Sequence, residues 1–273
     1  MLPQTAFWIC RGLALLLLGL GIVFGILKDT RRVFALLFGL VAAFLFQYML
    51  LPLVNGLVEG LLVSLAPETM HPWALLVITA VYEMLVFTLC ALPVKNMISA
   101  PLAWSFALGY WGFTVIYLFI GDLSTLLGSQ SIIFPGTALE TLCSAISPAL
   151  HLPLYCVLAL SGAALVSGAG FDLFWKGILW NLVHRLILAL PALLGTEIPL
   201  AVLLDGFWGL LLLVFSIRAA RRILSFETGE ALIMEDPMAE EAAGEDVPEE
   251  AKEEKEGEDV ATEEPDEEEA PEE

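Results

Sequence analysis

Seven apolar stretches, each long enough to cross a lipid bilayer, constrain this chain more than any other feature. A helix rises ~1.5 Å per residue, so ~20 apolar residues cover the ~30 Å hydrocarbon core of a membrane. Stretches of about this length occupy residues 7–27, 33–53, 73–93, 102–121, 149–167, 172–191 and 198–217. We therefore predict an all-α integral membrane protein with about seven transmembrane helices within residues 1–225.

The charged residues divide the chain into two parts. Residues 227–273 hold 23 acids and two lysines, a net charge of −21, whereas residues 1–226 hold nine acids and ten Lys or Arg, a net charge of +1. A segment so acidic and so poor in large apolar side chains has too little surface to bury, so we predict a disordered tail over residues 226–273. This tail is either solvated without a specific partner or binds basic proteins or divalent cations weakly. No basic patch typical of nucleic-acid binding is present.

The basic residues predict the orientation. With seven spans, most of them fall on one side of the membrane, and an excess of Lys and Arg marks the cytoplasmic side. They are Lys28, Arg31, Arg32, Lys95, Lys176, Arg218, Arg221 and Arg222, with Arg11 as the exception. We expect an outside N-terminus, a cytoplasmic acidic tail and a location in the plasma (inner) membrane.

Two connections between spans are too interrupted for confident assignment. Residues 54–72 mix apolar residues with four polar ones and end in prolines, so we expect an interfacial helix on the outer side. Residues 122–148 are semi-apolar and contain Pro135-Gly136 and Pro148, so we expect a re-entrant or interfacial segment there.

Four ionisable residues lie inside the predicted spans. They are Glu83, His184, Arg185 and Asp205. Each charge in hydrocarbon costs at least ~2.5–3.5 kcal/mol, so such residues are candidates for function. By helical rise, His184 and Asp205 lie roughly 10 Å and Glu83 roughly 15 Å below the outer surface. His71 and His151 flank spans beside prolines, so we interpret both as interface residues.

Two interpretations of these four residues stay open. In the first, Arg185 forms a buried ion pair with Asp205 or Glu83, and His184 is a hydrogen-bonded neighbour. In the second, Glu83, His184 and Asp205 bind a metal or activate water. One His with two carboxylates is plausible chemistry for zinc, but no HExxH motif supports it.

Several segments resemble the YhfC-type intramembrane metalloproteases, relatives of the CAAX-processing and PrsW-type membrane proteases. The span around Tyr82-Glu83 is similar to the family's Glu-Glu helix, although no basic residue follows closely. Gly109-Tyr110-Trp111-Gly112-Phe113-Thr114 is similar in spacing to its Gly-His-Gly-x-x-Glu segment. Asn181-Leu-Val-His184-Arg185 resembles its His helix, and Leu204-Asp205-Gly206 resembles its final acidic helix.

The resemblance implies a zinc-dependent peptidase fold with Glu83 in catalysis and His184 and Asp205 as metal ligands. A membrane protein or peptide would then be the substrate. Tyr110 and Thr114 stand where the family has His and Glu, which implies an impaired or altered site. Two other functions remain as alternatives. One is a small transporter or membrane-assembly component that uses the intramembrane polar residues, and the other is a scaffold that anchors the acidic tail.

Overall fold

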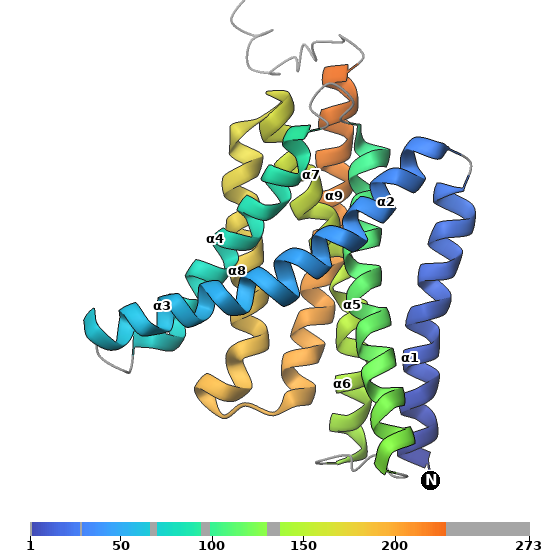
Figure 1. Ribbon diagram of the computed structural model, residues 1–273, viewed down its shortest axis with the longest axis vertical. Helices are drawn as coiled ribbons and strands as arrows, with labels where there is room; N and C mark the ends of the chain where they lie inside the picture. The colour runs from blue at the N-terminus through green and yellow to red at the C-terminus, as the bar shows by residue number, and fades with distance from the viewer. Residues whose placement is uncertain (1, 28, 66–69, 94–98, 130–136, 228–273) are drawn as a thin grey trace, which may run out of the picture. The chain divides into compact units, whose positions relative to one another are not determined.

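The computed structural model describes residues 2–27, 29–65, 70–93, 99–129 and 137–227, and these residues form helices without a single strand (Figure 1). The elements are α1 (Leu2–Gly21), η1 (Ile22–Ile26), α2 (Thr30–Ala42), η2 (Ala43–Leu50), α3 (Leu51–Leu65), α4 (His71–Ala91), α5 (Ala100–Ser129), α6 (Ala138–Leu150), α7 (Leu152–Ser167), α8 (Phe171–Leu194) and α9 (Ile198–Glu227). The expected acidic tail lies beyond Glu227, outside this description.

Seven helical segments of the described chain are long and apolar enough to cross a membrane, which confirms the predicted fold class. They cover Thr5–Ile26, Thr30–Ser64, His71–Ala91, Ala100–Gly128, Ala138–Ser167, Phe171–Leu194 and Ile198–Leu224. Each contains or closely overlaps one of the stretches recognised in the sequence. The large apolar side chains on their outer faces are exposed, as expected where lipid replaces water as the solvent.

The second span is longer than the sequence indicated. α2, η2 and α3 follow one another from Thr30 to Leu65 without a break, and η2 is a stretch of π-helix. Of the interfacial helix expected over residues 54–72, residues 54–65 are continuous with the second span, and residues 66–69 lie outside the described part of the chain. Apolar side chains continue across that expected boundary, so nothing in the local chemistry ends the helix there.

The fifth span differs most from the expectation. A capping box between Thr137 and Glu140 starts α6, and α7 follows after one non-helical residue, His151. Pro148 and Pro153 flank this position, and proline removes a backbone donor and obstructs the preceding turn. The span therefore runs from Ala138 to Ser167 with a break in its middle. Of the re-entrant or interfacial segment expected over residues 122–148, residues 122–129 instead prolong α5 and residues 138–148 form the first half of a helix long enough to span the membrane. Residues 130–136 lie outside the described part of the chain.

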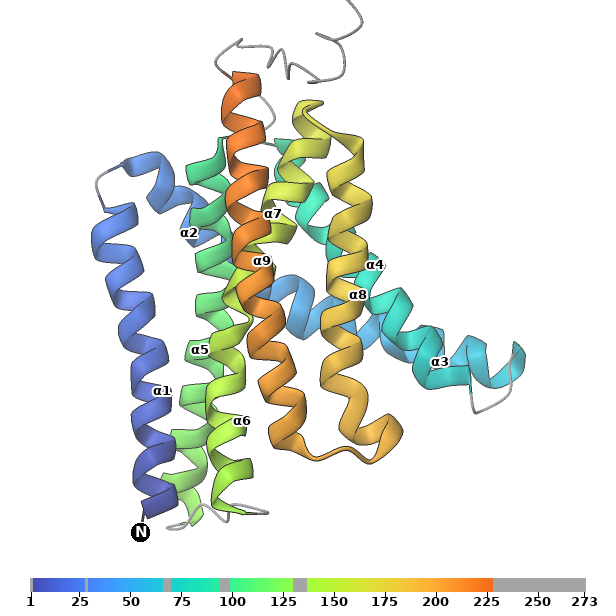
Figure 2. The ribbon, with the colours of Figure 1, turned by 180° about the vertical axis from the view of Figure 1, so that it is seen from behind.

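The helix α7 is the centre of the bundle. Ten of its 16 residues are buried, and they point to all sides of the helix. A helix that is apolar all round requires neighbours on every side, and α4, α5, α8 and α9 all pack against it. Figures 1 and 2 show these helices grouped around α7, with α1 on the far side of α5.

Two glycines fix the crossing of α2 and α5. A Cβ atom on Gly39 would overlap the carbonyl oxygen of Phe106, and one on Gly109 would overlap that of Leu36. Only residues without a side chain allow two backbones to approach so closely, a common device between membrane helices. The GxxxG glycines at positions 56 and 60, by contrast, have no neighbouring atoms within 4 Å.

The charged residues outside the centre are largely paired. Asp172 accepts hydrogen bonds at 2.9 Å from Lys176, as the sequence spacing suggested, and from Arg222 of α9. The start of α2, the start of α8 and the end of α9 lie at the same end of the bundle (Figure 2). Towards the opposite end, Arg11 forms an ion pair with Asp122 at 2.9 Å. This pairing neutralises the one basic residue that departs from the charge asymmetry.

Candidate functional site: two buried polar clusters

The structure gathers the intramembrane ionisable residues into two neighbouring clusters. We call Glu83, Asn181 and Arg185 the Glu83 cluster, and we call Asp205, His184 and His151 the Asp205 cluster. Four of the six residues are at least nine-tenths buried, and Asp205 is only 1% exposed. The clusters meet on α8, which packs against α4, α7 and α9.

The helical period of α8 explains why there are two clusters. Asn181 and Arg185 are four residues apart, so they share one face, which is directed at α4. His184 precedes Arg185 by one residue, which turns it ~100° around the helix axis. Its ring therefore points to α9 and the helix break at His151, while Arg185 points to Glu83.

The Glu83 cluster is a compensated ion pair. Nη2 of Arg185 donates to Oε2 of Glu83 at 2.6 Å, and Nδ2 of Asn181 donates to the same oxygen at 2.9 Å. Asn181 also donates to the carbonyl oxygen of Ala80 at 3.2 Å, which ties α8 to the backbone of α4. The structure thus selects Glu83, and not Asp205, as the carboxylate that pairs with Arg185.

The Asp205 cluster has a carboxylate between two imidazoles. Nδ1 of His184 lies 2.7 Å from Oδ1 of Asp205, and Nε2 of His151 lies 3.7 Å from Oδ2. The two rings are nearly perpendicular, with centroids 4.7 Å apart. Only the first distance lies within hydrogen-bonding range, and neither carboxylate oxygen accepts a well-aligned hydrogen bond from the described residues. Both oxygens of Asp205 therefore keep unused capacity to accept hydrogen bonds.

His151 is the functional candidate that the sequence analysis missed. Starting the span at residue 149 placed this residue at the surface, whereas the span begins at Ala138. His151 follows that start by 13 residues, which corresponds to ~20 Å of helix and places it near the middle of the candidate span. The signal was present as Pro148-x-x-His151-x-Pro153, in which two prolines break a helix around a histidine. Broken helices at this depth are typical of ion and substrate sites.

Local contacts on the broken helix extend the Asp205 cluster. Oγ of Ser147, one turn before His151, lies 3.5 Å from Nε2 of His151. Nε1 of Trp111 donates to the carbonyl oxygen of Pro148 at 2.7 Å and so stabilises the backbone next to the break. Nε1 of Trp208 donates to the carbonyl oxygen of Trp180 at 3.3 Å, which joins α9 to α8 beside the cluster.

Tyr110 and Thr114, which stand where the YhfC-type proteases have a His and a Glu, both make packing or hydrogen-bond contacts in the core. Tyr110 is 2% exposed and packs between the rings of Phe87 and Tyr155, with centroids 4.8 and 5.0 Å away. Thr114 donates to Oε1 of Gln47 at 3.0 Å. Both residues contribute to the core between α5 and its neighbours.

The imidazole nitrogens and carboxylate oxygens of the Asp205 cluster are atoms that zinc binds, but the distances between them do not match a zinc site. Two ligands held ~2.0 Å from a tetrahedral zinc lie ~3.3 Å apart, which is longer than the contact between Asp205 and His184. No group of three or more His, Cys, Asp or Glu in the described chain is arranged to hold a metal ion. All four cysteines are free thiols.

Comparisons with protein-family models, with curated proteins and with solved structures found no match for this chain. The similarity to the YhfC-type proteases therefore stays a prediction from its motifs. The geometry of the two clusters carries the functional argument.

Proposed function

We propose that this protein is a small proton-coupled transporter in which the Asp205 cluster binds the coupling proton. One observation carries the proposal: the carboxylate of Asp205 is buried between two imidazoles at a helix break inside the membrane. Ionisable groups at this depth are costly and characteristic of proton relays and transport pathways.

The chemistry of the three side chains fits proton binding. Imidazole is the side chain whose ordinary pKa lies nearest neutrality, and a carboxylate beside it accepts or returns a proton over a short distance. With both rings neutral, the cluster carries one negative charge. One bound proton makes it neutral, and a second gives it one positive charge. Ser147 extends the hydrogen-bonding groups along α6 and offers the first step of an entry route.

Solid-supported-membrane recording of proteoliposomes after a rapid pH change tests this proposal. A proton that enters the membrane field produces a transient current, even when the transported substrate is not supplied. We expect the wild-type protein to give this current and both Asp205→Asn and His151→Gln to lose it. His71→Gln is the matched control, because His71 is the first residue of α4 and belongs to neither polar cluster, and it should keep the current. A wild-type signal no larger than that of empty liposomes would refute the proposal.

The orientation follows from the same charge asymmetry that the sequence showed. We propose that the end carrying Arg31, Lys176 and Arg222 faces the cytoplasm and that the acidic tail follows it there. A reporter that is active only in the cytoplasm should work when fused after Arg222 and fail when fused near Pro3. Export of the C-terminal reporter would contradict this orientation.

A zinc-dependent peptidase of altered activity is the second candidate. The observation that favours it is that His151 brings a second imidazole beside His184 and Asp205, so the cluster offers two nitrogens and a carboxylate. Zinc, when bound there, would supply an activated water, while Asp205 would orient the ring of His184. Glu83 would have to leave Arg185 before it could act as a base.

Metal analysis of the purified protein separates the two candidates. The peptidase predicts about one zinc per chain, because the cluster forms a single site, and the zinc is lost in His184→Ala. The transporter predicts no stoichiometric zinc in either protein. Zinc in the wild type that survives His184→Ala would contradict the assignment of this cluster as the metal site.

A further inference from the structure

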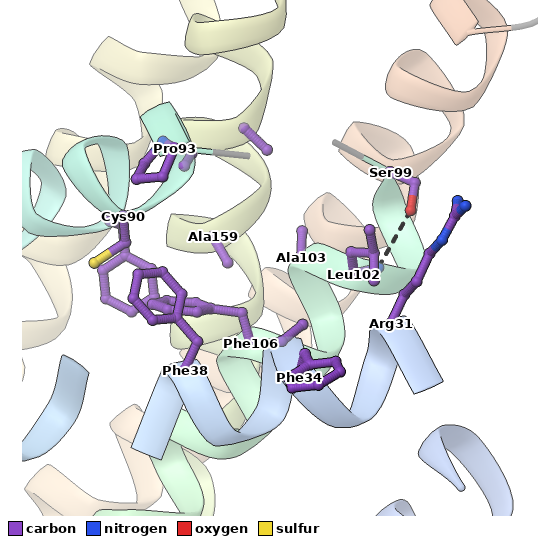
Figure 3. A pocket seen from close by; sticks show the side chains of 14 residues that line it. Arg31, Phe34, Phe38, Cys90, Pro93, Ser99, Leu102, Ala103, Phe106 and Ala159 are labelled. Atoms are coloured by element: carbon purple, nitrogen blue, oxygen red, sulfur yellow. Dashed lines mark hydrogen bonds between the residues drawn. The ribbon is translucent and has the colours of Figure 1, made fainter. Parts of the chain in front are cut away.

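A cavity of about 430 Å³ lies between α2, α4, α5 and α7 and shares no residue with either polar cluster (Figure 3). Its aromatic wall is formed by Phe38, Phe87 and Phe106, whose ring centroids are 5.5–5.7 Å apart along the row. Five alanines, at least one from each of the four helices, also line it, and their small side chains leave the space open.

The cavity runs from the lipid-facing surface into the core. At one end Phe34 is 67% exposed, and at the other Phe87 is 1% exposed. Among the described residues that line it, Arg31 is the one charged side chain and none is acidic. The nearest acid in sequence, Asp29, already contacts Arg32 at 3.7 Å. The opening therefore combines an apolar interior with one positive charge.

The physical chemistry of this space favours an apolar chain as its occupant. An apolar cavity does not hold water, since it offers water no hydrogen-bond partners. An empty space of this size would deprive the surrounding side chains of their dispersion contacts. Its volume lies in the range of small-molecule sites, ~300–1,000 Å³. Lipid chains are the solvent at this surface, and a guanidinium at the opening matches a phosphate.

We propose that this cavity binds one acyl chain of an anionic phospholipid, with Arg31 at the phosphate of its headgroup. The lipid enters from the leaflet at the basic end of the bundle, where α2 begins. Binding there would clamp α2 against α4 and α5. This site is separate from the proton site, so either proposal stands if the other fails.

Native mass spectrometry of the full chain tests this site by titration with phosphatidylglycerol and, separately, with phosphatidylcholine. We expect the wild type to retain one phosphatidylglycerol in preference to phosphatidylcholine. Arg31→Gln should lower this preference about fivefold, because one basic side chain near an anionic lipid contributes ~1 kcal/mol. Arg218→Gln is the matched control, since it removes an exposed positive charge of α9 away from the cavity, and it should leave the preference unchanged.

Two variants fill the cavity from opposite walls. Ala103→Leu extends a side chain from α5 and Ala35→Leu extends one from α2, so a folding defect in one leaves the other to decide. Each should lose the retained lipid while its helical content and unfolding transition stay at wild-type values. Equal retention of both lipids by the wild type would overturn the role of Arg31. Retention by both filled variants would overturn the cavity as the binding site.

Discussion

The two buried clusters share α8, which contributes the consecutive residues His184 and Arg185 to one cluster each. They differ in which groups surround the buried carboxylate. In the Glu83 cluster, a carboxylate faces a guanidinium at 2.6 Å and an amide at 2.9 Å. In the Asp205 cluster, a more deeply buried carboxylate faces two imidazoles, without a well-aligned hydrogen bond to either oxygen. In the Glu83 cluster, a guanidinium balances the charge of the carboxylate. In the Asp205 cluster, no permanent cation lies beside the carboxylate.

In the proposed function, this difference separates a structural role for the Glu83 cluster from a proton-binding role for the Asp205 cluster. A permanent cation next to a carboxylate locks two helices together and leaves no group free to change its protonation. A carboxylate between two imidazoles has no permanent cation beside it, and all three side chains belong to types that bind and release protons. Burial alone therefore does not distinguish the two clusters. The partner of each buried carboxylate distinguishes them.

The largest expected effect comes from removing one partner of the compensated pair. Arg185→Leu leaves Glu83 as an uncompensated buried charge, which should lower the free energy of unfolding by ~3–5 kcal/mol. Arg185→Leu combined with Glu83→Met should recover much of that loss, because Asn181 keeps its bond to the Ala80 carbonyl oxygen. Denaturant titration in mixed micelles measures the double variant and both single variants, Arg185→Leu and Glu83→Met. Additive losses in the double variant would show that the two side chains do not form a pair.

A packing defect away from both clusters should cost less and leave the proton site intact. Gly109→Ala forces α5 away from the backbone of α2, and overpacking of this kind costs ~1–3 kcal/mol. Gly121→Ala on the same helix meets no atom within 4 Å and should be silent. The pH-jump current per folded molecule should remain in both. Its loss in Gly109→Ala would mean that the current reports general destabilisation and not the Asp205 cluster.

A neutral substitution in the Asp205 cluster should change stability little but abolish the pH-jump current. Asp205→Asn removes a buried charge whose oxygens are poorly satisfied, so the free energy of unfolding should change by less than ~1 kcal/mol. The pH-jump current should nevertheless disappear. A loss of stability as large as that of Arg185→Leu would show that Asp205 is a structural ion-pair partner of its imidazoles, and the contrast between the clusters would fail.

The smallest effect is expected at the exposed end of α8. Lys176→Met removes one of the two cations that contact Asp172, in a pair whose side chains are about half exposed. Exposed ion pairs contribute ~0–1 kcal/mol, so the unfolding transition should hardly move. The same titration in mixed micelles checks it. A cost comparable to that of Arg185→Leu would mean that burial is not what distinguishes the Glu83 cluster.

The sequence predicted the spans well and the polar contacts only in part. Apolar length determines where helices cross a membrane, and that information is local, so all seven spans were recognised. The candidates Glu83, His184, Arg185 and Asp205 were found because charge inside an apolar run stands out. Which carboxylate pairs with Arg185 depends on how α4 and α9 pack against α8, and local sequence leaves both open.

Two features that the sequence analysis did not predict, the burial of His151 and the contact between α2 and α5, have the same origin. His151 was placed at the surface because the first half of its span, residues 138–148, contains enough polar residues and prolines to resemble a loop. The contact between α2 and α5 was not predicted because small residues four positions apart, such as Ala35 and Gly39 on α2, also occur where no helix packs against them, as at Gly56 and Gly60. Each depends on a partner distant in the chain.

The sequence by itself thus determined that this chain crosses the membrane as seven helices, since hydrocarbon accepts only segments that satisfy their own backbone hydrogen bonds. Only the tertiary structure decided that Arg185 turns to Glu83 and that His184 turns to Asp205 and His151. The physical reason is that a side chain one position further along a helix points ~100° away. Which neighbour it then meets depends on the packing of the other helices.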